Sequence, residues 1–196
     1  MISSIFMAVE TINQTSPVFD TSGKALKSGI DYYIKPAGTD KGGRLTLINR
    51  EPNLSPLYVG QGNVSRLPFH FKPFFTGETV VRESRDQMII SSVSTHCRRF
   101  SSWSIVAANA EDQRKLIVMR EPARGKVPDS IYFRITRSQP EVDGNSYILR
   151  WCPTDVCPNC TFADCGNIGS LVSSRGKRFL ALNGSELPVV FERARG

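Results

Sequence analysis

The sequence predicts an all-β domain, and three observations carry this prediction. Short runs of aromatic and β-branched residues recur along the chain between Gly, Pro, Asn, Asp and Ser residues. No long stretch keeps its apolar residues at the spacing of three and four that a helix needs, so almost no helix is expected. The runs also fall into a rough threefold layout of about sixty residues each. Together these features favour a β-trefoil, in which six strands close a barrel and three hairpins cap it.

The expected strands follow one another at fairly even spacing. Residues 104–115 contain several helix formers, but we interpret them as the end of a strand followed by an Asn/Asp turn. The threefold grouping joins the runs within 32–59, then those within 102–119, then those within 131–151. The expected strands are 32–35, 45–48, 57–59, 68–71, 88–91, 102–106, 116–119, 131–135, 147–151, 179–182 and 189–192.

Length and composition indicate one globular domain. The 196 residues are 40% hydrophobic and 22% charged, an ordinary balance for a domain with one core. The net charge of +7 is scattered along the chain, so we expect no nucleic-acid partner. No apolar run approaches the ~20 residues of a transmembrane helix, so we expect no membrane partner either. We assign residues 16–196 to the domain, which we expect to be a monomer. Residues 1–15 form an extension, which is a signal-peptide remnant, a tag or an alternative start.

Four of the five cysteines lie close together, at Cys152, Cys157, Cys160 and Cys165. Four-thiolate zinc sites usually combine two C-x2-4-C pairs separated by a longer loop, which this spacing does not provide. Two nested disulfides fit better, Cys157–Cys160 inside Cys152–Cys165, and we expect no metal. Disulfides form in oxidising compartments, so we expect a secreted protein. Acceptor patterns for N-glycosylation agree with secretion, and they place candidate sites at Asn13, Asn63, Asn159 and Asn183.

The segment 18–34, VFDTSGKALKSGIDYYI, resembles the signature of the plant Kunitz (soybean-trypsin-inhibitor-like) family. Asp20 to Gly23 form an Asx-type turn in this signature, where Gly23 can adopt a positive φ. Other segments agree in order: Gly42–Leu47, the stretch Val80–Asp86 (VVRESRD), and Cys97 followed by Trp103–Val106. The cysteine-rich stretch 151–169 resembles the miraculin-like branch of the family. The resemblance covers about residues 16 to 193.

The resemblance implies a protease inhibitor of plant defence that presents one substrate-like loop, at about residues 72–79, to a serine protease. Affinity in such inhibitors comes from a loop held in its bound geometry, so that little entropy is lost on docking. Lys72 would suit trypsin, but a proline follows it, which fits trypsin badly. Phe75 lies closest to the family's reactive position, with Phe74 beside it, so a chymotrypsin-like target is expected over trypsin. The residues expected to contact the protease are Lys72, Pro73, Phe74, Phe75, Thr76 and Gly77.

Two departures from the family pattern point to a less rigid loop and weaker inhibition. Family members carry a cysteine where this chain has Ser55, so Cys97 lacks its usual partner and is expected to be a free thiol. Losing such a disulfide typically costs ~2–5 kcal/mol. Ser28 stands where many active inhibitors have an asparagine that braces the loop. Serine can make the same kind of hydrogen bond but reaches less far.

Enzymatic chemistry finds little support in the sequence. His70 and His96 are the only histidines, and neither belongs to a recognisable hydrolase motif. Neighbouring residues in a strand point to opposite faces, which argues against pairing His96 with Cys97. We therefore expect no enzyme activity and no cofactor. The alternative function is that of a miraculin-like binding or storage protein that uses the same scaffold without inhibiting a protease.

Overall fold

The computed structural model describes residues 15–38, 42–50, 58–63, 67–91, 101–107, 113–121, 128–139 and 144–194. Within these ranges the chain forms twelve β-strands, one 3-10 turn (η1, Asp129–Ile131) and no α-helix. None of the described helical segments is long and apolar enough to span a bilayer. The strands are β1 (Tyr32–Pro36), β2 (Arg44–Ile48), β3 (Tyr58–Gly62), β4 (Phe69–Pro73), β5 (Gln87–Ser91), β6 (Ser101–Ile105), β7 (Ile117–Arg120), β8 (Arg134–Arg137), β9 (Tyr147–Trp151), β10 (Gly166–Val172), β11 (Arg178–Leu182) and β12 (Val189–Arg193).

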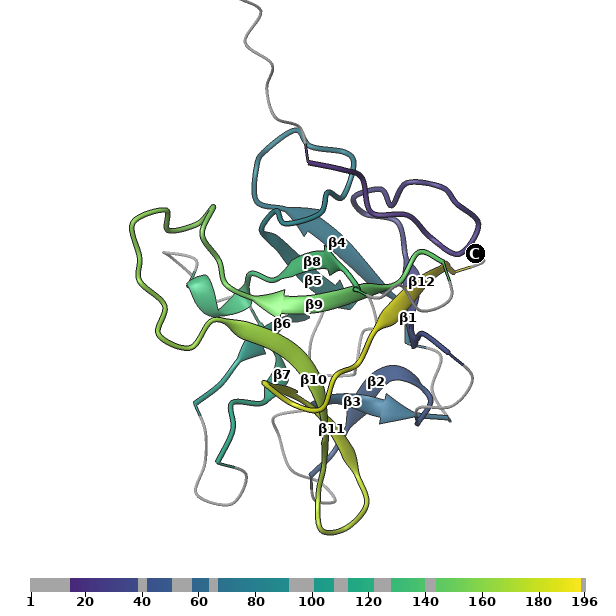
Figure 1. Cartoon of the computed structure of the whole chain (residues 1–196), viewed down its shortest axis with the longest axis vertical. Coiled ribbons are helices and arrows are strands. Elements are labelled where there is room, and N and C mark those ends of the chain that lie inside the picture. Colours follow the sequence, from purple (N-terminus) through teal and green to yellow (C-terminus); the bar gives the residue numbers. More distant parts are fainter. Residues whose placement is uncertain are drawn as a thin grey trace, which may run out of the picture.

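Six of the strands close a barrel (Figure 1). β1 pairs with β4 and β12, β4 pairs with β5, and β9 pairs with β8 and β12, all antiparallel. The remaining gap is closed by a bridge between Gln87, at the start of β5, and Phe133, just before β8. Closure leaves no long edge exposed along the barrel.

Three hairpins cap one end of the barrel, namely β2–β3, β6–β7 and β10–β11. They contact one another, since β3 pairs with both β7 and β11 and Leu116 bridges Ala181. The fold is therefore the β-trefoil that the sequence predicts. Its three four-strand units begin at Tyr32, Gln87 and Tyr147. The grouping taken from the sequence was wrong in phase, because its third group joined β8, the last strand of one unit, to β9, the first strand of the next.

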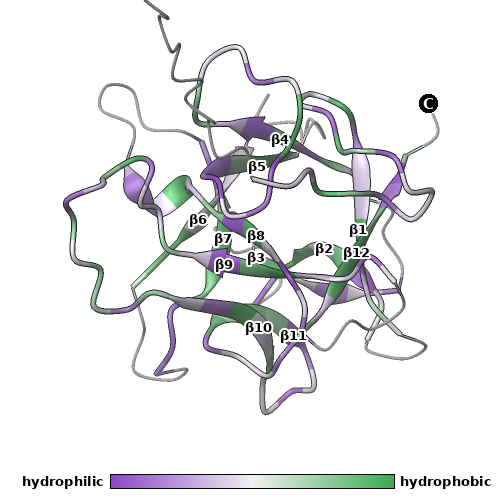
Figure 2. Cartoon of the chain, turned by 45° about the horizontal axis from the view of Figure 1, so that its top comes forward, coloured by the Kyte–Doolittle hydropathy of each residue, from purple (hydrophilic) through white to green (hydrophobic). Residues whose placement is uncertain are grey.

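The core lies inside the barrel and beneath the caps. Phe69 and Phe71 of β4 are fully buried, and His70 between them points outward, as alternation along a strand requires. Trp103 packs edge-on against Phe69 and Phe133 at ring-centroid distances of 5.4 and 5.9 Å. Figure 2 shows the apolar stretches gathered in the central strands and the polar ones in the outer loops.

Every expected strand has a counterpart in the structure, and most ends lie within two residues of the expected ones; the exceptions are β3, which ends three residues later than expected, at Gly62, and β8. β10 was not expected at all, because its first residues, Gly166-Asn-Ile-Gly169, lack the β-branched and aromatic pattern. Gly169 is needed there: a Cβ would lie 2.2 Å from the carbonyl oxygen of Ser185, which pairs with the neighbouring Ser170. The strand expected at 131–135 was placed too early, because Ile131 ends the η1 turn and β8 begins at Arg134.

Candidate functional site

The expected protease-contact segment, residues 72–79, runs from the end of β4 around an exposed turn. In Figure 1 the chain after β4 forms a loop at the upper edge of the molecule, near the first described residues, where Pro17 bridges Arg82. Both ends of this contact loop are fixed by main-chain hydrogen bonds. The Phe74 N–H donates to the Asp86 carbonyl at 2.9 Å, and the Thr79 carbonyl accepts from the Ser28 N–H at 2.9 Å. The loop is thus held at its base by the segments that precede β1 and β5, the two strands that flank β4.

The tip of the contact loop is a turn closed by the Glu78 N–H, which donates to the Phe75 carbonyl at 3.4 Å. Gly77 has a φ of 90°, a conformation that other residues adopt only with strain. Thr76 and Gly77 are exposed, and residue Phe75 is 41% exposed. The turn therefore presents an aromatic side chain to solvent.

Phe74 and Phe75 lie in different environments although they are adjacent. Phe74 is half-buried and packs on a small cluster with Met88, Tyr132 and Val156. Its ring meets Tyr132 edge-on at 5.4 Å and Phe75 at 5.2 Å. Both phenylalanines are expected from the sequence to contact a protease; in the structure Phe74 packs on this cluster, and Phe75 lies at the exposed turn.

Lys72 and Pro73 belong to β4 and not to the exposed turn. Lys72 is exposed but lies opposite Met88 in the β4–β5 ladder, and Pro73 is buried opposite Gln87. The Lys72–Pro73 bond therefore sits inside a paired strand. This placement adds to the sequence argument against Lys72 as the residue that a protease recognises.

Ser28 approaches the contact loop through its main chain. Its N–H donates to the Thr79 carbonyl, and the next N–H, of Gly29, donates to the Phe71 carbonyl at 3.2 Å. Lys27 forms a bridge with Val80 directly after the loop. The segment around Ser28 thus supports the loop by backbone contacts, and the side-chain brace expected at this position stays a prediction.

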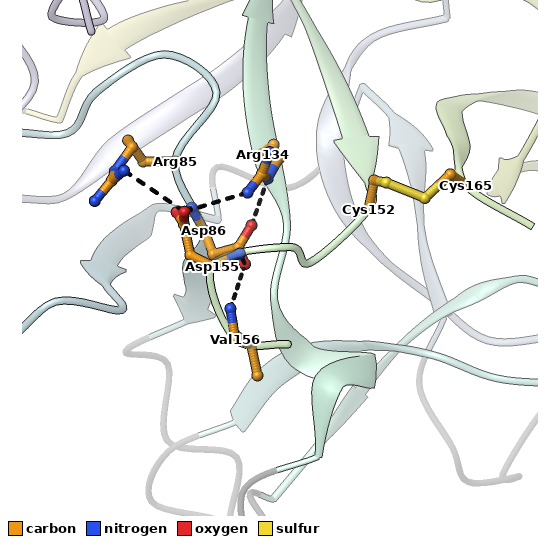
Figure 3. Close-up of polar contacts among 7 residues, drawn as sticks. All are labelled: Arg85, Asp86, Arg134, Cys152, Asp155, Val156 and Cys165. Atoms are coloured by element: carbon orange, nitrogen blue, oxygen red, sulfur yellow. Dashed lines mark hydrogen bonds and ion pairs between the residues drawn. A yellow bond between two sulfur atoms is a disulfide. The ribbon is translucent and has the colours of Figure 1, made fainter. Parts of the chain in front are cut away.

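A buried carboxylate lies directly behind the contact loop (Figure 3). The side chain of Asp86 is fully buried and pairs with the Arg134 guanidinium through the Nε atom. Its Oδ2 atom accepts hydrogen bonds from the N–H groups of Asp155 at 2.6 Å and Val156 at 2.9 Å. Burial raises the pKa of the Asp86 carboxyl above its ordinary value, although Arg134 and the Val156 N–H lower it. Burial, with the Asp86 charge as a smaller cause, also raises the pKa of Tyr132.

A second charged group reaches Phe75 itself. The Arg85 guanidinium carbon lies 4.3 Å from the centre of the Phe75 ring, a cation–π arrangement. The same guanidinium lies 3.5 Å from the Asp155 carboxylate. The sequence singled out Val80–Asp86 only as a family-like stretch, and it did not identify Arg85, Asp86, Arg134 or Asp155 as neighbours of the loop. The only sequence feature that could have indicated these contacts is the presence of charged residues, Arg85 and Asp86, shortly after the expected loop.

The structure contains both disulfides that the spacing favours, Cys152–Cys165 and Cys157–Cys160. Cys97 and Ser55 lie outside the described residues, as do His96 and Asn13. The candidate glycosylation residues Asn63, Asn159 and Asn183 are all exposed.

Other kinds of site are sparse in the described part of the chain. No group of three or more His, Cys, Asp or Glu side chains there is arranged to hold a metal. His70 lies beside Asp31, with its Nδ1 atom 3.4 Å from a carboxylate oxygen. A polar hollow of about 570 Å³ opens over β9 and β10, away from the contact loop. Its lining includes Arg137, Arg150, Asn167, Asn183 and Glu186.

Comparison with known proteins gives consistent matches. The family model for Kunitz-type trypsin and protease inhibitors of the legume class matches residues 18–193. The chain is 33% identical to Kunitz type trypsin inhibitor 111 of Medicago truncatula, over 98% of this chain and 95% of the relative. It is also 33% identical to miraculin of Synsepalum dulcificum, over 90% of this chain and 82% of the relative. Among solved structures, a Kunitz-type cysteine protease inhibitor from potato superposes with a TM-score of 0.77 at 25% identity, covering 93% of this chain and 99% of that one.

Proposed function

Because this chain belongs to the Kunitz family of trypsin and protease inhibitors, we propose that it blocks a serine protease of chymotrypsin-like specificity with its contact loop. Phe75 enters the primary specificity pocket of the protease, where an apolar slot accepts an aromatic side chain. The Phe75–Thr76 bond then occupies the place of the scissile bond. Phe74 stays packed on the inhibitor and holds the loop from behind.

One observation carries this proposal. Phe75 is a large aromatic residue, 41% exposed, at the tip of a turn whose two ends are hydrogen-bonded to the barrel. An exposed aromatic residue on a preorganised turn loses little conformational freedom on binding, which is the usual basis of tight inhibition. Aromatic residues are also among those that most often dominate binding energy at interfaces.

The alternative is a binding or storage protein that shares the scaffold, as the similarity to miraculin permits. The relatives compared above are named as protease inhibitors or as miraculin, and none of these names is that of an enzyme. We further propose a monomeric, secreted or vacuolar protein of plant defence, glycosylated at one or more of the exposed asparagines. The two disulfides support this location, because they persist in oxidising compartments.

A titration of proteases with the purified chain tests the proposal. Chymotrypsin, trypsin and papain are each incubated with increasing inhibitor, and the residual activity gives the inhibition constant (Ki). We expect Ki for chymotrypsin to be at least about tenfold lower than for trypsin, a difference of ~1.4 kcal/mol. Papain is included because the potato structure is described as a cysteine protease inhibitor. No inhibition of any of the three at micromolar concentration would favour the non-inhibitory alternative.

A further inference from the structure

The segment closed by the Cys152–Cys165 disulfide lies against the base of the contact loop, although nearly seventy residues separate Asp86 from Asp155 in the chain. Asp86 connects the two loops through its side chain and its main chain. Its carboxylate accepts the N–H groups of Asp155 and Val156, and its own N–H donates to the Asp155 carboxylate at 2.8 Å. Its carbonyl accepts the Phe74 N–H. A single buried residue is therefore bonded to both segments.

Arg85 makes a second connection, which ends at the exposed aromatic ring. Its guanidinium faces Phe75 on one side and the Asp155 carboxylate on the other. Asp155 is also 3.5 Å from Arg134, which pairs with Asp86. The position of Asp155 therefore influences where the Arg85 side chain lies, and Arg85 in turn restricts the orientations open to the Phe75 ring.

An apolar contact completes the junction. Val156 packs in the same cluster as Phe74, Met88 and Tyr132. The disulfide segment also has its own local hydrogen bonds, from the Thr154 N–H to the Cys152 carbonyl at 2.9 Å and from the Cys157 N–H to the Pro153 carbonyl at 3.2 Å. These bonds present residues 155 and 156 to Asp86 in a fixed turn.

From these three contacts we infer that the disulfide segment positions the contact loop, with Asp155, Arg85 and Asp86 as the positioning residues for Phe75. This inference rests on the proposed function, because it names what holds the proposed reactive residue in place. The contact loop makes only one hydrogen bond across its own turn, at 3.4 Å, so its shape depends on what lies behind it. Support from the disulfide segment adds to the main-chain hydrogen bond that Ser28 donates to the loop.

Replacing Asp155→Asn tests the inference with little change of shape. One amide oxygen can still accept the Asp86 N–H, but the amide nitrogen then faces the cations Arg85 and Arg134, so both charge pairs are lost. The matched control is Asp164→Asn, an aspartate of the same disulfide segment whose ion pair is with Lys115 at 2.7 Å, on the exposed surface. Both variants lose one negative charge from the same segment.

Two quantities are measured for each variant: amide hydrogen exchange of residues 74–79 in the free protein, and Ki for chymotrypsin. For Asp155→Asn we expect exchange about tenfold faster and Ki about tenfold higher than for the unmodified chain, which corresponds to ~1.4 kcal/mol in each. For Asp164→Asn we expect changes below about twofold in both. Equal behaviour of the two variants in hydrogen exchange would overturn the inference.

A second variant keeps the inference testable if Asp155→Asn fails to fold. Arg85→Gln removes the cation over Phe75 at a partly exposed position, where we expect the fold to be kept. It should raise Ki about three- to tenfold while the melting temperature stays within about 3 °C. If the unmodified chain inhibits chymotrypsin and Arg85→Gln has the same Ki, the proposed role of Arg85 is wrong. If the unmodified chain inhibits no protease, the proposed function fails, and hydrogen exchange alone still decides whether the disulfide segment positions the loop.

Discussion

Replacing the two adjacent phenylalanines one at a time should separate stability from inhibition. Phe74→Ala removes the ring of a half-buried residue that packs on Tyr132 and Val156, whereas Phe75→Ala removes the ring of a residue that is 41% exposed. If the loop works as proposed, the first change costs folding stability and the second costs binding. The two effects should therefore appear in different assays.

The magnitudes follow from the two environments. A fully buried Phe→Ala change costs about 3–5 kcal/mol, so for half-buried Phe74 we expect about 2–3 kcal/mol. For a chain of this size that lowers the melting temperature by about 4–12 °C. Phe75 loses mainly its contacts with Arg85 and the edge of Phe74, which together contribute about 1 kcal/mol at an exposed site. Its loss from a protease pocket should cost about 2–4 kcal/mol of binding, a rise in Ki of roughly 30- to 1,000-fold.

Thermal unfolding followed by circular dichroism gives the stability change, and titration of chymotrypsin gives Ki. Phe74→Ala should raise Ki only about tenfold, through a looser loop. Two results would refute the reasoning. Equal destabilisation by both changes would mean that Phe75 also packs inward. A larger loss of inhibition in Phe74→Ala than in Phe75→Ala, at intact folding, would mean that the reactive position is one residue earlier.

Three further predictions concern charge, pH and thiols. Phe75→Arg should shift inhibition from chymotrypsin toward trypsin, whereas Lys72→Ala should change Ki by less than about twofold, because Lys72 precedes a buried proline within β4; a large loss of inhibition in Lys72→Ala would show that the protease recognises Lys72. The pKa of the Asp86 carboxyl is raised in the folded chain, so over the pH range between 3.8 and the folded pKa this carboxyl is protonated in the folded chain and ionised in the unfolded chain. The stabilisation that this protonation provides is therefore complete below pH 3.8 and is lost as pH rises through the folded pKa. The unfolding free energy of the unmodified chain minus that of Asp86→Asn, from urea denaturation at several pH values, should therefore fall as pH rises above 3.8, and a rise would show that the pKa is lowered instead. Because the chain has five cysteines and four of them form disulfides, a thiol assay in denaturant should find one free thiol per chain, and finding none would mean that Cys97 pairs between molecules.

The sequence was sufficient to predict the fold class, because most strands can be recognised from their own aromatic and β-branched residues. β9, at Tyr147–Trp151, has the bounds expected from its aromatic and β-branched residues. β10 could not be recognised in this way. Its glycines are required because residues 183–185 of the same chain lie close beside Gly166 and Gly169, and this close approach is a property of the tertiary structure.

The site was predictable only in part, for the same reason. Gly77 and its neighbours marked a loop through their turn chemistry, and the structure places an exposed turn there. The contacts of Asp86 with Asp155 and Val156 join segments that are distant in sequence and have no shared periodicity. Such contacts follow from the closure of the barrel and cannot be read from either segment alone.

The most direct test of the proposed reactive residue is to identify the bond that the protease cleaves. The chain is incubated for a long period with a catalytic amount of chymotrypsin, and the fragments are identified by mass spectrometry under non-reducing conditions. A substrate-like inhibitor is hydrolysed slowly at the bond it presents, so we expect a single cut between Phe75 and Thr76. A first cut at any other bond, or rapid degradation with no protected intermediate, would contradict the account.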